Sequence, residues 1–344
     1  MALFNVTNLF DSGVGSLRQA ILDSNAMAGA DTIQFSGVTG TITLTRGELS
    51  ITDNLTINGP GANNFSVSGN NNSRVFYIYN PSTTIDVFID GLTITRGIAF
   101  FAGGIFNREE NLTLSNSTVS RNLSSYGGGV LNSNGTTSIS NSTISGNLAN
   151  DGGGVLNSNG ITSISNSTIS NNSAYYGGGV SNSYGTTSIS NSTVSGNLAN
   201  DGGGVFNRGT LNLANTIIAN STGGDCATFG LDTNVNNLIE DGSCDPTLSG
   251  NPNLGPLQDN GGPTFTQALL PGSIAIDAGS NAAIPPGITT DQRGAGFSRI
   301  VNGTVDIGAY EASPNVPPVP EPSSLFGILT LGLVAIGSLR RRRK

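Results

Sequence analysis

A 25-residue repeat constrains this chain more than any other feature of its sequence. Triple-glycine knots begin at residues 127, 152, 177 and 202, and asparagine and aliphatic series keep the same step. Between the knots, segments such as TTSISNSTISGN alternate small polar and β-branched residues with period two, a pattern typical of strands. A unit of this length without a helical segment predicts one coil of a parallel β-solenoid.

Stacked coils place equivalent residues in rows, about 4.8 Å apart along the axis. We expect the aliphatic series to fill the interior and the asparagines to lie at inward corners, where their amides hydrogen-bond along the row. Because no single coil buries its own apolar face, stability comes from contacts between neighbours. The predicted ladder is Asn107, Asn132, Asn157, Asn182 and Asn207; two further series begin at Asn116 and Asn122.

The repeat also resembles a known family. The segments GGIFN, GGGVLN and GGGVSN, the last two followed by SISNSTISGN-type stretches, resemble the repeats of chlamydial polymorphic outer-membrane proteins and related β-helix surface proteins, over residues 100–220. The resemblance implies an all-β fold, a right-handed single-stranded parallel β-helix. It implies no activity, because β-helices include lyases, hydrolases, adhesins and inert stalks.

An N-terminal cap is predicted over residues 1–30. The segment GSLRQAILDSNAMAG predicts a helix, with Ser16 as its N-cap and Gln19 completing a capping box. Its apolar residues share one face and would seal the open end of the solenoid. Less regular coils follow at residues 31–99, so we expect the β-helix to span residues 31–220. The region around this helix resembles the N-terminal segment of many bacterial β-helix surface proteins.

Residues 221–313 break the period, and we expect irregular final coils and a C-terminal cap there. The segment DQRGAGFSRIVNGTVDIGAYE resembles the closing motif of cell-surface β-helix proteins that carry a choice of C-terminal anchors. We expect a surface ion pair to hold this cap, a type of pair that contributes little to stability. Its members would be Arg293 or Arg299 with Asp306 or Glu311.

The two cysteines of the chain, Cys226 and Cys244, fall in the same irregular region. In an exported protein they would form a disulfide that stabilises by about 3 kcal/mol. The alternative is a pair of free, buried thiols. Two cysteines in a chain without histidine argue against a zinc site.

The C-terminal segment predicts the location of the protein. Residues 314–324 form a Pro-rich linker, and residues 325–344 an apolar stretch followed by RRRRK. The apolar part, residues 325–339, predicts a C-terminal hydrophobic helix of about 22 Å, which is short for a bilayer core of about 30 Å. The three parts together resemble the PEP-CTERM sorting signal, with Pro320, Glu321 and Pro322 as its motif.

That resemblance implies a partner and a route. An exosortase in the inner membrane of a Gram-negative bacterium would process the chain near the motif, after transient contact of residues 325–339 with that membrane. The protein would then reside at the cell surface or outside the cell. The first residues, MALFN, contain neither the basic nor the apolar segment of a secretory signal, so we expect the true start to lie upstream of Met1.

Composition excludes several functions. The chain has no histidine, and its only lysine is Lys344, which excludes imidazole catalysis and a Schiff-base lysine in the body. Without the five terminal basic residues, the chain has nine basic and 22 acidic residues, which gives a net charge of −13. A body this acidic repels phosphate backbones, so no nucleic-acid partner is expected.

One row of residues has the character of a site. Tyr126, Asp151, Tyr176 and Asp201 directly precede successive glycine knots and would stack along one edge. They form either a solvated edge produced by duplication of a 50-residue unit or a glycan-binding edge with tyrosine platforms. Asp151 and Asp201 would lie about 9.6 Å apart, at the wide limit for an inverting glycosidase. Exposed loop positions also do not supply the raised pKa that such a pair needs.

The sequence therefore favours a non-enzymatic exported β-helix protein with a structural, adhesive or polysaccharide-associated role. The alternative is a polysaccharide lyase or glycoside hydrolase on the same fold. A lyase needs a basic residue beside calcium-binding carboxylates, and the repeat region offers only Arg108, Arg121 and Arg208. No cofactor is expected; calcium stays open, although no calcium-binding motif is present. The expected partners are the exosortase and exopolysaccharide or other surface glycans.

Overall fold

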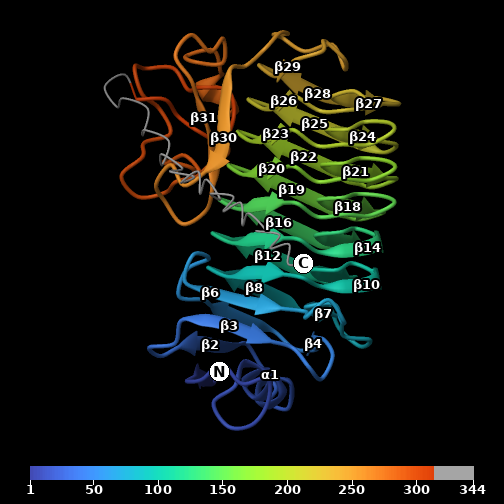
Figure 1. Cartoon of the computed structure of the whole chain (residues 1–344), viewed down its shortest axis with the longest axis vertical. Coiled ribbons are helices and arrows are strands. Elements are labelled where there is room, and N and C mark those ends of the chain that lie inside the picture. Colours follow the sequence, from blue (N-terminus) through green and yellow to red (C-terminus); the bar gives the residue numbers. More distant parts are fainter. Residues whose placement is uncertain (314–344) are drawn as a thin grey trace, which may run out of the picture. The chain divides into compact units, whose positions relative to one another are not determined.

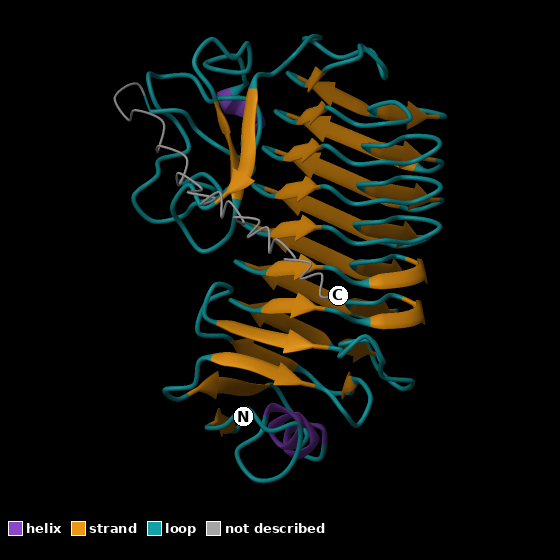
Figure 2. Ribbon diagram, in the orientation of Figure 1, coloured by secondary structure: helices purple, strands orange, loops and turns teal. Residues whose placement is uncertain are grey.

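The computed structural model describes residues 1–313, and three long β-sheets, here called sheets A, B and C, contain most of their strands (Figure 2). The regular part of the chain passes through sheet C, sheet A and sheet B in turn and then returns to sheet C (Figure 1). The pairing between coils is parallel in all three sheets. The chain is therefore an all-β parallel β-solenoid, as the repeat predicted.

Each coil adds one strand to each sheet, so the three sheets run the length of the solenoid. Sheet A contains β1 (Leu3–Val6), β2 (Asp31–Phe35), β5 (Leu55–Asn58), β8 (Asp86–Asp90), β12 (Asn111–Ser115), β16 (Thr136–Ser140), β19 (Ile161–Ser165), β22 (Thr186–Ser190), β25 (Thr210–Ala214) and β28 (Thr233–Val235). Sheet B contains β3 (Gly40–Thr43), β6 (Phe65–Ser68), β9 (Thr93–Thr95), β13 (Thr118–Ser120), β17 (Thr143–Ser145), β20 (Thr168–Ser170), β23 (Thr193–Ser195), β26 (Ile217–Ala219) and β29 (Leu238–Ile239). Sheet C contains β4 (Leu49–Ile51), β7 (Phe76–Ile78), β11 (Ile105–Arg108), β15 (Val130–Ser133), β18 (Val155–Ser158), β21 (Val180–Ser183), β24 (Val205–Asn207) and β27 (Cys226–Thr228). The remaining elements are α1 (Leu17–Asn25), the pair β10 (Ile98–Phe101) and β14 (Leu123–Tyr126), the pair β30 (Leu254–Gln258) and β31 (Thr266–Leu269), and the short 3-10 helix η1 (Asn281–Ala283).

The regular coils keep the register of the sequence repeat. Val130 pairs with Val155 in sheet C, and Ile139 pairs with Ile164 in sheet A. All four side chains are fully buried and belong to one hydrophobic core that runs through the coils. The period of 25 residues therefore returns each apolar side chain to the same interior column.

Two of the three asparagine series form the predicted ladders inside the solenoid. The amide Nδ2 of Asn107 donates to Oδ1 of Asn132 at 3.1 Å, and Asn132 donates in the same way to Asn157 at 3.0 Å. The row continues through Asn182 to Asn207, and all five residues are fully buried. The series that begins at Asn122 repeats this arrangement. Aligned amides satisfy one another's buried polar atoms, which an apolar interior otherwise penalises.

The third series departs from the inward ladder that we expected. Asn116 and Asn141 adopt positive φ values of 45° and 48° at the corner between sheets A and B. Asparagine tolerates this left-handed conformation better than most residues, so the backbone of the corner explains the repeat. The side chains bond partly to other groups: Asn116 donates to Asp90, whereas Asn166 donates to Asn141.

Helix α1 lies at the N-terminal end of the coils, where the cap was predicted (Figure 1). The Ser16 side chain accepts a hydrogen bond from the Gln19 backbone N–H, as expected of an N-cap. The reciprocal half of the capping box is absent, because the Gln19 side chain donates to Asp23 instead. The apolar face of the helix joins the main core through Leu17 and Ile21. Strand β1 already belongs to sheet A, so the sheet begins within the segment expected to form the cap.

Residues 251–313 lie in a different place from the one that we expected. They do not close the end of the coils but run along the outer face of sheet B, with β30 and β31 beside the stacked strands (Figure 1). Thr264 donates to the Asn141 carbonyl, and the Ala309 backbone N–H donates to the Thr193 hydroxyl. In β26, Ile217 and Ala219 replace the threonine and serine of the preceding coil and belong to a second apolar cluster, which the segment helps to bury. We call residues 251–313 the flanking segment; its apolar contributors to that cluster include Leu269, Ala275 and Ile307.

A buried ion pair fixes the flanking segment. Arg299 pairs with Glu311 at 2.9 Å, and both side chains are only 1 % exposed, whereas we expected a surface pair. The Glu311 carboxylate also accepts the backbone N–H groups of Val301 and Asp306. Arg293 pairs with neither predicted acid but with Asp291, at 2.6 Å.

Candidate functional site

The four residues that precede the glycine knots lie on consecutive coils at the rim between sheets B and C. Parallel bridges join Tyr126 to Asp151, Asp151 to Tyr176, and Tyr176 to Asp201. Toward the N-terminus the row continues to Phe101 through the pairing of β10 with β14. The period thus stacks these side chains in one row, and the row is longer by one aromatic residue than the sequence analysis proposed.

Glycine at the start of each knot lets the rim fold tightly onto the outer face of sheet C. Gly127 has a φ of 67°, in the left-handed region that favours glycine. A Cβ atom there would lie 2.8 Å from the Cβ of Leu131, which is too close. Leu131 is only 3 % exposed, because the rim covers a small apolar cluster that contains Leu131, Ala102 and Leu156.

A first aromatic cluster forms where the rim meets the earliest regular coils. Phe101 stacks on Tyr126 with ring centroids 5.6 Å apart, and Phe100 meets the same tyrosine edge-on at 5.6 Å. Phe101 also lies 6.0 Å from Phe106, whose ring is 5.5 Å from that of Tyr77. These are favourable geometries for aromatic pairs. Phe100 is nevertheless 62 % exposed, so the cluster presents ring surface to solvent.

A second cluster forms farther along the same side. Tyr176 stacks on Phe206 at 5.1 Å, and Tyr175 meets Tyr176 edge-on at 4.6 Å. Phe229 adds an edge-on contact to Phe206 at 6.5 Å. Tyr175 and Phe229 are 52 % and 81 % exposed. The second cluster therefore combines the buried ring of Phe206 with exposed rings, whereas the first contains only half-buried and exposed rings.

Arginine side chains lie over rings of both clusters. Arg74 is 4.9 Å from the centroid of Tyr77, and Arg208 is 4.8 Å from that of Phe206. Arg108 lies 4.4 Å from the Tyr79 ring beside the first cluster. Such contacts hold a guanidinium in place while leaving some of its N–H donors free. We call the two clusters, the rim residues between them, Tyr79 and the three arginines the aromatic strip.

Asp151 lies between the two clusters and is half-buried, contrary to the exposed position that we expected. Burial raises the pKa of Asp151, and the Ser181 hydroxyl and the Arg208 guanidinium offset only part of that rise. Ser181 stands where Leu131, Leu156 and Phe206 stand in other coils, which leaves room for a polar group. The Asp151 Oδ1 and Ser181 Oγ atoms are both buried without a well-formed hydrogen bond. Both atoms are enclosed by the protein, so neither is presented to solvent.

Sequence reasoning identified Tyr126 and Tyr176 but missed the other rings of the strip. The signal was present in the register, because Phe101 precedes Tyr126 by 25 residues. Likewise, Phe206 follows Ser181 by 25 residues in the outward row of sheet C. Arg74 gave no such signal, because it lies in the irregular coils before the repeat.

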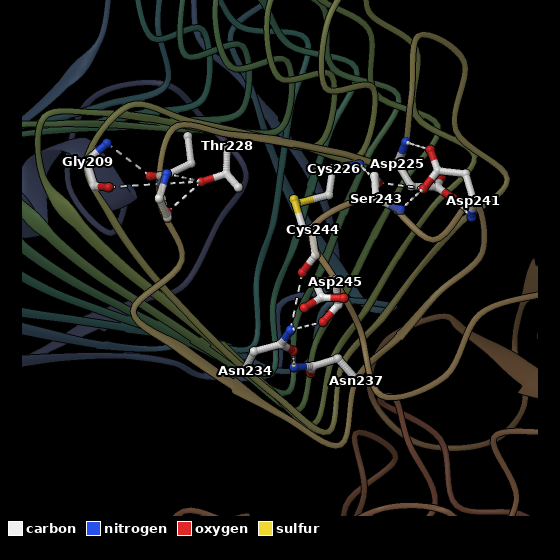
Figure 3. Close-up of a disulfide and its surroundings, with 12 residues drawn as sticks. Gly209, Asp225, Cys226, Thr228, Asn234, Asn237, Asp241, Ser243, Cys244 and Asp245 are labelled. Carbon is white, nitrogen blue, oxygen red and sulfur yellow. Dashed lines mark hydrogen bonds between the residues drawn. A yellow bond between two sulfur atoms is a disulfide. The ribbon is translucent and has the colours of Figure 1, made fainter.

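The structure joins Cys226 and Cys244 in the predicted disulfide, with Cα atoms 5.9 Å apart (Figure 3). Cys226 belongs to the main hydrophobic core, and Cys244 packs against it. The loop that carries Cys244 crosses the last coil, where the Asn234 side chain donates to the Cys244 carbonyl (Figure 3). The disulfide loop thus covers the C-terminal end of the core, the role that we had expected of the flanking segment.

Hydrogen bonds between two aspartates hold this loop in place. The backbone N–H of Asp225 donates to the Asp241 carboxylate at 2.9 Å, and the Asp241 N–H donates back to Asp225 at 3.2 Å (Figure 3). Burial, together with the nearby Asp241 charge, raises the pKa of Asp225 to about 6. Each carboxylate thus already accepts a backbone hydrogen bond. Within residues 1–313, no three cysteine, aspartate or glutamate side chains gather in an arrangement that would hold a metal ion.

The sorting motif Pro320–Glu321–Pro322, the linker and the hydrophobic tail fall outside the residues that the structure describes. In the described part of the chain, no helix has the length and apolar character needed to cross a membrane.

Comparison with protein families matches residues 318–344 to the PEP-CTERM protein-sorting motif. That motif implies an exported protein, held in the membrane before an exosortase processes it. Comparison with curated proteins returns no match. Among solved structures, the crystal structure of pectate lyase Pel9A is similar over 91 % of this chain and 97 % of that chain, with 15 % identity and a TM-score of 0.48.

Proposed function

We propose that this exported protein is a non-enzymatic β-solenoid of the bacterial cell surface or extracellular matrix, and that it binds polysaccharide through the aromatic strip. The observation that carries the proposal is the exposure of aromatic rings, packed against one another in clusters, along one side of the solenoid. Soluble proteins rarely leave contiguous aromatic surface exposed without a binding partner. Phe100, Tyr175 and Phe229 are each more than half exposed in the strip.

Sugars suit such a surface. A pyranose ring has an apolar face of C–H groups that packs on an aromatic ring, while its hydroxyls need hydrogen-bond donors and acceptors at the edges. The strip supplies rings, the guanidinium groups of Arg108 and Arg208, and the half-buried carboxylate of Asp151. Because the glycines and the buried rings hold these groups in place, binding costs little conformational entropy.

The location follows from the sorting motif. Processing by an exosortase near Pro320, Glu321 and Pro322 would release the solenoid from the inner membrane of a Gram-negative cell, after insertion of residues 325–339. Mass spectrometry of the mature protein tests this step. A C-terminus near the motif supports release, whereas a C-terminus that still carries Arg340–Lys344 supports permanent anchoring.

The binding role has a direct test. Full-chain protein is incubated with insoluble polysaccharides, neutral and uronate, and the bound fraction is measured. We expect retention on at least one polymer and loss of retention in the Phe101→Ala/Tyr126→Ala double variant. Tyr184→Ala is the matched control, because Tyr184 is 72 % exposed but lies at the corner between sheets C and A. Equal retention of the double variant, or none by the parent protein, overturns the proposal.

A glycoside hydrolase or lyase is the second candidate, and the raised pKa of Asp151 favours it. Asp201 lies two coils away, about 9.6 Å by the strand spacing, at the limit for an inverting pair. Incubation of the protein with calcium and a glycan panel decides between the two. Release of reducing or unsaturated ends, abolished in Asp151→Asn, establishes an enzyme, and binding without turnover supports the non-enzymatic role.

A further inference from the structure

We propose that the aromatic strip takes a neutral, linear polysaccharide whose chain runs parallel to the solenoid axis. This inference rests on the proposed function and narrows it to a substrate class and a binding direction. Three observations carry it: the axial spacing of the exposed rings, the polar groups between them, and the balance of charge on the strip.

The exposed rings are distributed along the axis. Phe100 and Tyr175 occupy the same row of the rim, because Phe101 and Tyr176 are linked through the bridges at Tyr126 and Asp151. They are three coils apart, about 14 Å at the strand spacing of ~4.8 Å. A ligand that touches both rings must therefore extend along the solenoid over several sugar residues.

Hydrogen-bonding groups fill the interval between these two rings. The same row contains Ser125 and Asn150, and Asn150 is exposed. The neighbouring row contains the half-buried carboxylate of Asp151. Rings at both ends and hydroxyl-binding groups between them match a chain that alternates apolar faces and hydroxyl edges along its length.

The charge on the strip opposes a polyuronate. Two of its three arginines already face carboxylates, since Arg74 pairs with Glu48 at 2.9 Å and Arg108 with Glu109 at 3.4 Å. Asp151 and Asp201 add two further carboxylates in the row of the rim. Three guanidinium groups therefore meet four carboxylates on a body whose net charge is already negative, which disfavours an anionic chain.

Titration calorimetry on the full chain tests the substrate class. The probes are cellohexaose, laminarihexaose, xylohexaose and mannohexaose, with hexagalacturonate as the anionic counterpart. We expect at least one neutral probe to bind at least tenfold more tightly than hexagalacturonate. Tighter binding of hexagalacturonate overturns this inference and leaves the proposed function intact, whereas failure of every probe contradicts both.

Two single substitutions test the direction. Phe100→Ala and Tyr175→Ala each remove an exposed ring at one end of the interval, and Tyr184→Ala removes a more exposed ring outside the strip. For a hexasaccharide running along the axis, both strip variants lose affinity by up to about tenfold, the value of one aromatic contact. The Tyr184→Ala variant keeps parental affinity.

The disaccharide of the probe that binds is the companion measurement. It is too short to reach both rings, so we expect at most one of the two strip variants to weaken it. A hexasaccharide that responds to one substitution only runs across the strip instead, which overturns the axial direction. Circular dichroism of each variant confirms that the solenoid is folded, so a loss of binding is assigned to the missing ring.

Discussion

The regular coils and the flanking segment bury apolar surface by opposite means. In the coils, one backbone and side-chain pattern repeats, so Asn132 makes for its coil the same hydrogen bonds that Asn157 makes for the next. In the flanking segment, individual contacts occur once each, such as the buried pair between Arg299 and Glu311. The coils thus share their stability among many equivalent neighbours, whereas the flanking segment depends on a few specific groups.

This difference predicts how far the destabilising effect of a substitution extends through the molecule. When one contact in the coils is lost, the equivalent contacts in the neighbouring coils still stabilise the structure. A lost contact in the flanking segment has no copy, but the main-chain ladders beneath do not depend on it. We therefore expect large but local effects in the segment and smaller effects, transmitted along the axis, in the coils.

The largest effect is expected at Arg299. Arg299→Met leaves Glu311 buried without its partner, a change that costs about 3–5 kcal/mol. Hydrogen exchange should show loss of protection at Val301 and Asp306, whose N–H groups donate to Glu311, while β19 and β22 stay protected. Arg121→Met is the control, because Arg121 is exposed and forms no ion pair among the described residues. Equal loss of protection in the coils contradicts the comparison.

The next effect concerns the disulfide, which lies between the two regions. Its cysteines are 18 residues apart, and removal of such a bridge costs about 3 kcal/mol. Reduction should lower the melting temperature and expose the last coil first, as judged by limited proteolysis. The Cys226→Ser/Cys244→Ser variant is the control, because it should melt at the lower temperature whether or not a reductant is present. An unchanged melting temperature on reduction counts against the closing role of this loop.

A smaller effect is expected for one member of the asparagine ladder. Asn157→Ala removes a fully buried amide, which leaves the Asn182 Oδ1 without its donor and takes one acceptor from the Asn132 amide, at a cost of about 2 kcal/mol. Denaturant unfolding measures the loss. Asn200→Ala, at an exposed rim position, should change stability by less than about 0.5 kcal/mol. Equal losses for the two variants are incompatible with a stabilising ladder.

The smallest effect is a pH dependence at the C-terminal end of the coils. The pKa of Asp225 is about 6 in the folded protein and 3.8 in its ordinary state, so folding favours the protonated form. The resulting stabilisation is complete below pH 3.8 and is lost as pH rises through 6. Between pH 5 and 8 we expect a loss of about 1 kcal/mol that Asp225→Asn does not show. Identical pH profiles for parent and variant refute this assignment.

The same contrast explains what the sequence revealed. The core columns and two asparagine ladders were predictable, because a 25-residue identity fixes the register of every copy. The flanking segment was not, because side-chain pairs far apart in sequence hold it, and no period relates Arg299 to Asn166, which it contacts. One signal was available: Ile217, Ile218 and Ala219 are apolar on both faces of a strand, which indicates that something covers the outer face.

The strip was predictable in part for the same reason. Tyr126 and Tyr176 stood out because they recur at a fixed place in the repeat. The burial of Asp151 depends on the serine at 181, which departs from the repeat, so its environment became visible only when neighbouring coils were placed side by side.

The common register of the coils also determines how this protein can change in length. Gain or loss of one whole 25-residue unit keeps every ladder and interior column intact. The flanking segment, however, contacts the coils from Asn141 to Asn215, so the distance that it spans along the axis is fixed. A unit inserted there would pull it away from its partners, whereas a unit inserted before Gly127 would leave it undisturbed. We expect length variants of this chain to grow on the N-terminal side, where each added unit also lengthens the rim between sheets B and C.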